Sequence, residues 1–461
     1  MPDEAANNSV DTIAAIATPT GSGGIGVVRV SGSNALAILK GVFNPHKKKS
    51  RPSPYLLRLG QIKSASGETL DEVLSVYMPG PKSYTGEDLV EIYCHAGAMV
   101  LGAILEAIFA AGCRPAEAGE FSLRRFLNRG EDLTRLEGAA DIVAAKTELS
   151  YRVSRQHLIG VYGKLITKLR NNIVNILAEL EADIDFPDED DVGRIGQELL
   201  SEKLESVISQ LEDLSLSYRT GKIIRDGYRV VILGPPNAGK SLLFNRLVKR
   251  NRALVTPVPG TTRDYISEWI DIRGLPVELY DTAGIRRGRG RVEKAGIASS
   301  QNLIKQADMI IYLFDITRRP TAIPDVRLSN TQRLTIALNK VDLCDYTHGI
   351  IKRWTDKLGV ASPIFGISAK TGKGLRNLTK IIYESAGITD LTDGLFVTTN
   401  RHKNKIDKCL AHLKRIKKMS APVEVISWEL RQAADAIGEI TGHIYTEQIL
   451  EEIFSNFCIG K

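Results

Sequence analysis

The stretch GPPNAGKS, from Gly234 to Ser241, limits what this chain can fold into more than any other feature. It fits the pattern G-x-x-x-x-G-K-[ST] and lies between the apolar run YRVVIL and the amphipathic run SLLFNRLV. A strand, a glycine-rich turn and a helix in this order bind phosphate, because the N–H groups of the turn and the helix N-terminus attract anions. We therefore expect a P-loop α/β unit in which Lys240 reaches the β- and γ-phosphates and Ser241 binds Mg²⁺.

Three further motifs follow in the order typical of guanine-nucleotide sites. DTAG (Asp281 to Gly284) offers an acid that supports Mg²⁺ and a glycine N–H for the γ-phosphate. NKVD (Asn339 to Asp342) offers a carboxylate that accepts from N1–H and the 2-amino group of guanine, a donor pair that adenine lacks. SAK (Ser368 to Lys370) follows the next apolar run, and its Ala369 N–H is expected to meet guanine O6. Together the four motifs predict a GTP site.

The residues expected to contact GTP lie in these motifs and in the segment TPVPGTTRD. They are Asn237, Ala238, Gly239, Lys240, Ser241, Leu242, Thr256, Pro257, Val258, Pro259, Gly260, Thr261, Thr262, Asp281, Thr282, Ala283, Gly284, Asn339, Lys340, Asp342, Ser368, Ala369 and Lys370.

The residue after D-x-x-G raises the question of how GTP is hydrolysed. Ras-type enzymes place a glutamine there to orient water, and this chain has Ile285, whose aliphatic side chain cannot do so. No arginine is evident in cis, although the run RRGRGR follows at once. Asn237 and TPVPGTTRD offer neutral oxygens suited to a monovalent cation between the phosphates. Glu293 is the nearest acid able to orient or activate water.

The spacing of apolar residues and glycines divides the chain into four segments. Residues 1–125 are strand-like and rich in glycine, residues 126–225 and 386–461 show helical periodicity, and residues 226–385 alternate β-runs with amphipathic segments. The alternation predicts a parallel sheet with helices on both faces. We expect a multidomain α/β and α chain: an α+β N-terminal domain, a central all-α domain formed by two segments, and a Ras-like G domain inserted between them.

Composition limits the binding partners and the cellular compartment that we expect for this chain. The formal net charge of +7 mildly favours a polyanionic partner. The five cysteines include no CxxC pair, which argues against a disulfide framework or a zinc site. The opening MPDEAANNSVDT holds three acids and no arginine, unlike a targeting leader, and no apolar run reaches membrane-spanning length. We expect a cytoplasmic chain with no membrane partner.

The N-terminal glycines Gly21, Gly23 and Gly26 satisfy G-x-G-x-x-G. A dinucleotide site needs a helix after these glycines, whereas VVRVSG predicts a strand. The pattern therefore indicates a glycine-rich turn between strands rather than an NAD or FAD site.

The motifs together resemble the MnmE (TrmE) family of tRNA-modification GTPases, through nearly the whole chain. The likeness rests on ATPTGSGGIGVVRVSG, YTGEDLVEIYCHAG, AGEFSLRRFLN, the four GTP motifs, PGTTRD and the terminal FCIGK. The GTP motifs are shared by many GTPases, whereas the N-terminal blocks and the tail are specific to this family. The resemblance implies that Glu293 activates water. It implies potassium ligands at Asn237, Thr256, Val258 and Thr261, and magnesium ligands at Ser241 and Thr262.

The resemblance also implies that the N-terminal domain dimerises and binds 5-formyltetrahydrofolate or a related one-carbon folate. Implied folate contacts are Arg29, Glu91 and Lys461, with the tail folded back so that Cys458 is a positioned, reactive thiol. A buried, inert Cys458 is the alternative. Two positions after the asparagine of FLN, the family usually has Lys or Arg. Gly130 stands there in this chain, with Arg129 next to it as a substitute contact.

The function implied is that of a potassium-stimulated GTPase. With the flavoprotein MnmG (GidA), in a heterotetramer or larger complex, it would install a carboxymethylaminomethyl or aminomethyl-type group on C5 of the wobble uridine of tRNA. The lysine-rich run HKNKIDKCLAHLKRIKK is either a solvated face or a contact to tRNA phosphates. The alternative function is a ribosome-assembly GTPase switch of the Era or Der type. No GxxG loop follows Ala386 and there is one phosphate loop, which argues against both.

Overall fold

The structure is a computed structural model, and it describes residues 11–19, 21, 23–47, 53–185, 197–253, 266–281, 303–320, 329, 332–344, 348–358, 363–388, 394–419 and 421–460. The chain divides into two compact units. The first unit consists of Met1–Ala140 with Gly438–Lys461, and the second consists of Asp141–Ile437. Helices α4 (Leu133–Ala144) and α13 (Val423–Thr441) run from one unit into the other.

A seven-stranded sheet forms the centre of the first unit, in the order β3-β4-β5-β6-β2-β1-β7. All its pairings are antiparallel except β1 with β7. Helices α1 (Ala35–Val42) and α2 (Ala98–Ala110) bury apolar side chains against it. The strands are β1 (Ile13–Ile16), β2 (Gly23–Ser31), β3 (Phe43–Pro45), β4 (Arg58–Lys63), β5 (Thr69–Met78), β6 (Leu89–Ala96) and β7 (Arg114–Pro115).

The strand predicted after the N-terminal glycines is present, but it begins earlier than expected: Gly21 precedes β2, and Gly23 and Gly26 lie within it. β2 pairs with β6, and the register shifts between Gly23 and Gly26. A side chain at Gly26 would place its Cβ 2.8 Å from the Leu101 side chain of α2, so glycine allows this helix to pack closely on the sheet. A strand where a dinucleotide site needs a helix confirms that the motif is structural.

The C-terminal tail is folded back within the first unit. Helix α14 (Glu447–Phe454) packs with α3 (Glu120–Arg129) in a cluster that includes Phe126, Phe454 and Phe457. Ile459 forms an antiparallel bridge with Ala118. Gly460 has a φ of 90°, and a Cβ there would lie 2.2 Å from the Ile16 carbonyl oxygen. The expectation that the tail is not frayed is confirmed up to Gly460, and Lys461 lies outside the described residues.

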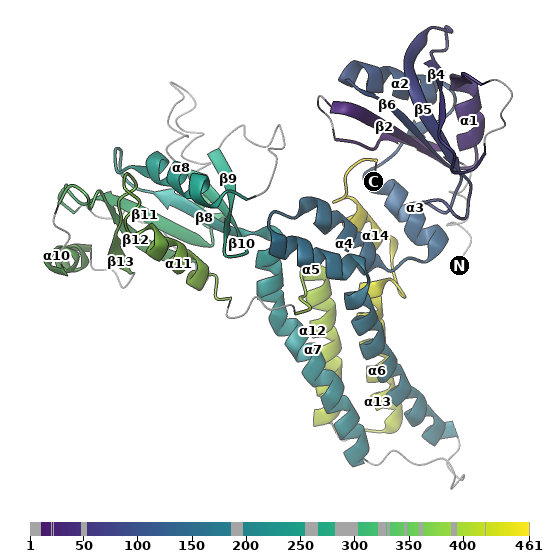
Figure 1. Cartoon of the computed structure of the whole chain (residues 1–461). Coiled ribbons are helices and arrows are strands. Elements are labelled where there is room, and N and C mark those ends of the chain that lie inside the picture. The colour runs from purple at the N-terminus through teal and green to yellow at the C-terminus, as the bar shows by residue number, and fades with distance from the viewer. Residues whose placement is uncertain are drawn as a thin grey trace. The chain divides into compact units, whose positions relative to one another are not determined.

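Long helices make up part of the second unit (Figure 1). They are α5 (Glu148–Leu158), α6 (Val161–Asp185), α7 (Gln197–Asp226) and α12 (Asn400–Lys418), together with most of α13. Helices α7 and α12 lie side by side. On α12 the apolar stripe predicted from periodicity, Ile406, Leu410, Leu413 and Ile416, is buried, as an amphipathic helix requires.

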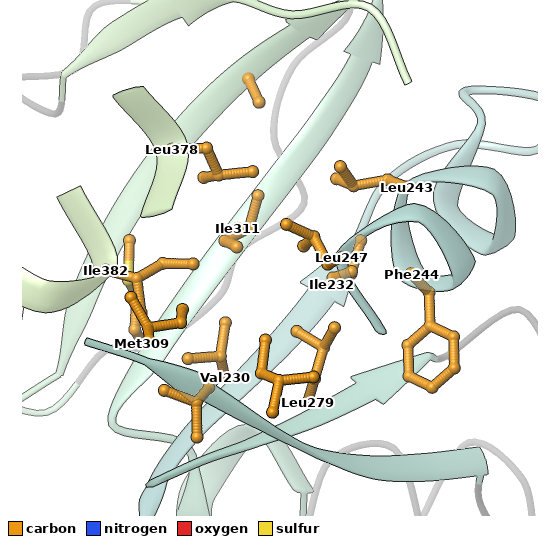
Figure 2. Packing of buried hydrophobic residues seen from close by; sticks show 14 of the residues in the cluster. Val230, Ile232, Leu243, Phe244, Leu247, Leu279, Met309, Ile311, Leu378 and Ile382 are labelled. Atoms are coloured by element: carbon orange, nitrogen blue, oxygen red, sulfur yellow. The ribbon is translucent and has the colours of Figure 1, made fainter. Parts of the chain in front are cut away.

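A six-stranded sheet forms the rest of the second unit, in the order β13-β12-β11-β8-β10-β9. Leu243, Phe244 and Leu247 of α8 (Lys240–Asn251) lie in one apolar cluster with Val230, as Figure 2 shows. Trp354 of α10 (His348–Leu358) belongs to a separate cluster. Helix α11 (Leu375–Ser385) joins the first cluster. The strands are β8 (Tyr228–Leu233), β9 (Ile266–Ile272), β10 (Leu275–Asp281), β11 (Met309–Asp315), β12 (Arg333–Asn339) and β13 (Ile364–Gly366).

The expectation of an all-parallel sheet is wrong at one edge. β9 is antiparallel to β10, whereas the other pairings in this sheet are parallel. The two strands are joined at Arg273 and Gly274, whose φ values are 58° and 89°. Two positive φ values in a two-residue turn match the twist of a hairpin. The turn sequence Arg-Gly lacks the Asn-Gly or Asp-Gly signature that would have revealed it.

Candidate functional site

Several of the predicted motifs lie where parallel strands of the second unit end. β8, β10, β11, β12 and β13 are parallel, so their carboxyl ends meet at one edge of the sheet. The phosphate loop follows β8 and begins at Gly234, which has a φ of 145°. A Cβ at this position would lie 2.2 Å from the Leu313 carbonyl oxygen of β11. Glycine therefore lets the loop run directly against the neighbouring strand.

Helix α8 presents its N-terminus to the phosphate loop. Its N-cap residue Gly239 makes no side-chain cap hydrogen bond, and the first N–H groups of a helix have no partner inside it. The Lys240 ammonium donates to the carbonyl oxygens of Gly234 (2.9 Å) and Pro235 (3.0 Å), which holds its charge beside the loop. Ser241 is exposed in the first turn. A cation and a helix N-terminus in one place fit a phosphate group.

Asn339 connects the phosphate loop to the two loops expected to bind the base. Its Nδ2 donates to the Ala238 carbonyl oxygen (2.8 Å), and its Oδ1 accepts from the Ala369 N–H (2.9 Å). Asn339 is 2% exposed. A Cβ at Gly239 would lie 2.3 Å from Asn339 Nδ2, so this contact also depends on glycine. One buried amide therefore brings three of the predicted motifs together.

Asp342 follows in the same turn and is exposed. A hydrogen bond with the Ser368 side chain lowers the pKa of Asp342, and the nearby cations Lys370 and Lys340 act in the same direction. Ser368 is fully buried, and its hydroxyl also accepts from the Thr371 N–H (3.0 Å). The turn thus presents an exposed, ionised carboxylate beside a rigid loop, as recognition of the guanine N1–H and 2-amino group requires.

Sequence reasoning missed Asp315, the last residue of β11. Its Oδ2 accepts from the Lys340 ammonium at 2.6 Å, and its Oδ1 accepts from the Thr317 N–H and hydroxyl. Burial would raise the pKa of Asp315, but these hydrogen bonds outweigh burial and the pKa lies below its usual value. The sequence did hold a signal for this residue: Asp315 ends the apolar run DMIIYLFD, and the next apolar run leads into NKVD.

The structure describes only some of the other residues that are predicted to bind GTP. Asp281 ends β10, is 3% exposed and pairs in register with Ile232, next to the start of the phosphate loop. Asn237 has a left-handed backbone, with a φ of 63°, and is exposed, as is Leu242. Several expected residues lie outside the described part of the chain: Thr256, Pro257, Val258, Pro259, Gly260, Thr261, Thr262, Thr282, Ala283, Gly284, Ile285 and Glu293.

A second polar cluster lies in the first unit around Arg29. The guanidinium donates to Glu91 Oε1 from Nε (2.9 Å) and Nη2 (2.7 Å), and from Nη1 to the Gly460 carbonyl oxygen (3.2 Å). The Tyr93 hydroxyl donates to Glu91 Oε2 (2.7 Å). Burial and this carboxylate raise the pKa of Tyr93 to about 12. A ligand that reaches Glu91 must therefore share its oxygens with Arg29 and Tyr93.

The remaining folate candidates lie on α3 and the tail. Arg129 Nη1 donates to the Ser83 carbonyl oxygen (2.9 Å). Gly130 ends α3 with a φ of 60°, a left-handed C-cap that favours glycine and offers no side chain for a ligand. Cys458 is exposed, so the alternative of a buried thiol is wrong, and the reactivity of the thiol stays a prediction. The Arg29 guanidinium also lies over the rings of Tyr84 and Phe121, two residues that no sequence motif singled out.

The basic helix α12 is less cationic than its sequence suggests. Lys403 pairs with Asp407 on the same helix, and Arg415 pairs with the buried Glu429 of α13 at 2.7 Å. Lys414 and Lys417 pair with glutamates of α7. These pairs neutralise part of the face proposed to meet tRNA phosphates. Among the helices that the structure describes, none is long and apolar enough to cross a membrane.

Two family models match this chain. A model described as the GTP-binding protein TrmE N-terminus matches residues 12–130, and one described as the MnmE helical domain matches residues 133–458. Among solved structures, a variant of Aquifex aeolicus Era bound to GDP and AlF4− is 20% identical. It covers 42% of this chain and 68% of its own, with a TM-score of 0.28, too low to support an argument.

Curated relatives resemble the chain along almost its whole length. A protein of Alkaliphilus metalliredigens is 41% identical over 98% of this chain and 99% of its own length. Proteins of Desulforamulus reducens and Carboxydothermus hydrogenoformans are each 39% identical with the same coverage. All three are named tRNA modification GTPase MnmE. The chain therefore belongs to the MnmE family of tRNA-modification GTPases.

Proposed function

We propose that this chain is a potassium-stimulated GTPase that acts with a flavoprotein partner of the MnmG type. The pair installs a carboxymethylaminomethyl or aminomethyl-type group on C5 of the wobble uridine of tRNA. One observation carries the proposal: Asn339 brings the phosphate loop and both base-recognition loops together, in a chain that aligns with the MnmE relatives along 98% of its length. That alignment favours this function over an Era- or Der-like ribosome-assembly switch.

Different residues are proposed to bind the phosphates, the base and the metal ions of the nucleotide complex. Lys240 and the α8 N-terminus bind the phosphates, and Asp342 reads the base. The Ala369 N–H donates to Asn339 Oδ1 in the structure, so guanine O6 would have to share it. Ser241 and Thr262 are the proposed ligands of Mg²⁺, and Asp281, at the end of β10, is proposed to support them. When bound, Mg²⁺ and K⁺ supply positive charge for the phosphates. Asn237, Thr256, Val258 and Thr261 remain the proposed potassium ligands, and Glu293 the proposed water-orienting acid.

The second polar cluster is proposed to take the folate. Arg29 is a fixed cation with aromatic rings beside it, a combination that suits a flat ligand with carboxylates. Glu91, Arg129, Cys458 and Lys461 are proposed neighbours of that ligand. A bound folate would supply the one-carbon unit for the new group.

A homodimer through the first unit is also proposed. Leu56, Leu57, Leu59 and Leu74 are exposed there, and Leu59 is paired in register with Leu74 on the next strand. Leu56 and Leu57 lie just before β4, so the exposed apolar side chains follow one another on and beside the paired strands β4 and β5, which is typical of an interface. The proposed domain boundaries, at residues 125, 225 and 385, place these leucines in the N-terminal domain.

Mass spectrometry of tRNA nucleosides tests the function. Cells that lack this chain are expected to lose the aminomethyl-type wobble uridines, and the intact chain supplied on a plasmid is expected to restore them. The Leu216→Ala variant, altered at an exposed position of α7 outside the predicted sites, is expected to restore the modified uridines at matched expression. Unchanged wobble uridines in the deleted cells would contradict the assignment.

The choice of alkali ion should change the rate of GTP hydrolysis. Turnover in KCl is expected to exceed turnover in NaCl at equal ionic strength by about tenfold, a modest share of what an arginine finger supplies elsewhere. The Asn237→Gly variant keeps the left-handed backbone and removes the amide oxygen, so its potassium advantage should disappear. Equal turnover of the unaltered chain in the two salts would refute the cation proposal.

A further inference from the structure

The ion pair between Asp315 and Lys340 has no assigned role, although Lys340 is the second residue of NKVD. Asp315 and Asn339 end adjacent strands and are paired in register. Asp315 is 5% exposed, and Thr317 fixes its carboxylate through two hydrogen bonds to Oδ1 (3.0 Å from N–H, 2.6 Å from the hydroxyl). Its other oxygen, Oδ2, accepts from the Lys340 ammonium at 2.6 Å, with Arg318 Nε farther away at 3.7 Å.

Lys340 has a backbone conformation that lysine rarely adopts. Its φ is 71°, in the left-handed region where a Cβ meets steric repulsion. Residues held in this way persist only where their surroundings fix them, and they gather at functional sites. The surroundings here are the 2.6 Å pair with Asp315 and two backbone bonds of the turn, Val341 N–H to Ile367 oxygen and Leu343 N–H to Lys340 oxygen.

We propose that Asp315 is a positioning residue for guanine recognition: by holding Lys340 it keeps the NKVD turn in the left-handed form that presents Asp342 to the base. This inference rests on the assignment of Asp342 to guanine made above. Because the base is common to GTP and GDP, losing the Asp315–Lys340 pair should lower the affinity for both nucleotides by the same factor. Turnover at saturating GTP should fall less than the affinity does.

The test is a double-mutant cycle on GDP affinity, measured by fluorescence of a labelled GDP. Asp315→Asn is nearly isosteric and is expected to raise the Kd for GDP roughly tenfold, a typical effect of one charged hydrogen bond. Lys340→Gly removes the backbone strain, since glycine adopts positive φ freely. Adding Asp315→Asn to Lys340→Gly is therefore expected to change the Kd by less than about twofold.

Two controls separate this role from a structural one. Thr317→Ala removes one of the two hydrogen bonds that hold the same carboxylate but keeps the backbone bond and the Lys340 pair, and should raise the Kd for GDP much less than Asp315→Asn does. Thermal unfolding of the nucleotide-free variants reports their folding independently. An equal loss from Asp315→Asn in both backgrounds, or an equal loss in Thr317→Ala, would overturn the inference. Failure of the guanine assignment would look different, because the unaltered chain would then bind ADP as well as GDP.

Discussion

Lys240→Ala is expected to weaken GTP binding by about a hundredfold or more and to abolish measurable turnover. In the structure its ammonium is held beside the phosphate loop by the carbonyl oxygens of Gly234 and Pro235. A hydrogen bond to a charged group contributes about 1.5–3 kcal/mol, and this cation has two phosphates to reach. A loss near 3 kcal/mol corresponds to roughly a hundredfold in affinity.

Isothermal titration with GTP measures the effect of Lys240→Ala. Lys249→Ala is a matched control, because it removes the same charge from the exposed last turn of the same helix α8. It should change the affinity by less than about twofold. If both variants lose affinity equally, the effect comes from net charge, and the placement of Lys240 at the phosphates is wrong.

Asp342→Asn is expected to change which base the chain binds. The carboxylate accepts from the guanine N1–H and 2-amino group, whereas an asparagine amide donates from its nitrogen and repels that amino group. Xanthine has a carbonyl oxygen at the same position, so the asparagine can donate to it while still accepting from N1–H. We expect GDP affinity to fall by at least about a hundredfold and XDP to bind more tightly than GDP, because the asparagine leaves the guanine amino group without an acceptor and supplies a donor to the xanthine carbonyl.

Competition between GDP and XDP for a labelled nucleotide measures this switch. Asp356→Asn, which removes an equal charge from an exposed position of α10, should leave the preference for GDP intact. A variant at Asp342 that still prefers GDP would show that the base is read elsewhere.

Much of the nucleotide site could be predicted because its motifs are local in sequence. A glycine-rich turn between YRVVIL and SLLFNRLV determines strand, loop and helix within one short stretch, and the structure has β8 and α8 there. NKVD and SAK follow predicted strands, so their meeting at one edge follows from the parallel sheet.

Contacts between distant segments could not be predicted in this way. Asp315 precedes Lys340 by 25 positions, and only the register of β11 with β12 brings the two together. Lys414 and Lys417 of α12 looked free because the glutamates that pair with them, Glu212 and Glu205, lie on α7, more than 200 residues earlier. The left-handed φ of Gly130 likewise depends on where α3 ends.

We propose that guanine-nucleotide turnover at these loops drives the chemistry on tRNA. The most direct measurement uses the purified Asp342→Asn chain with the flavoprotein partner, folate, an amine donor and unmodified tRNA. The modified wobble uridine is then quantified with GTP, with XTP or with no nucleotide. We predict that XTP supports the modification and that GTP at the same concentration does not. Equal product with GTP, or product without any nucleotide, would contradict the account.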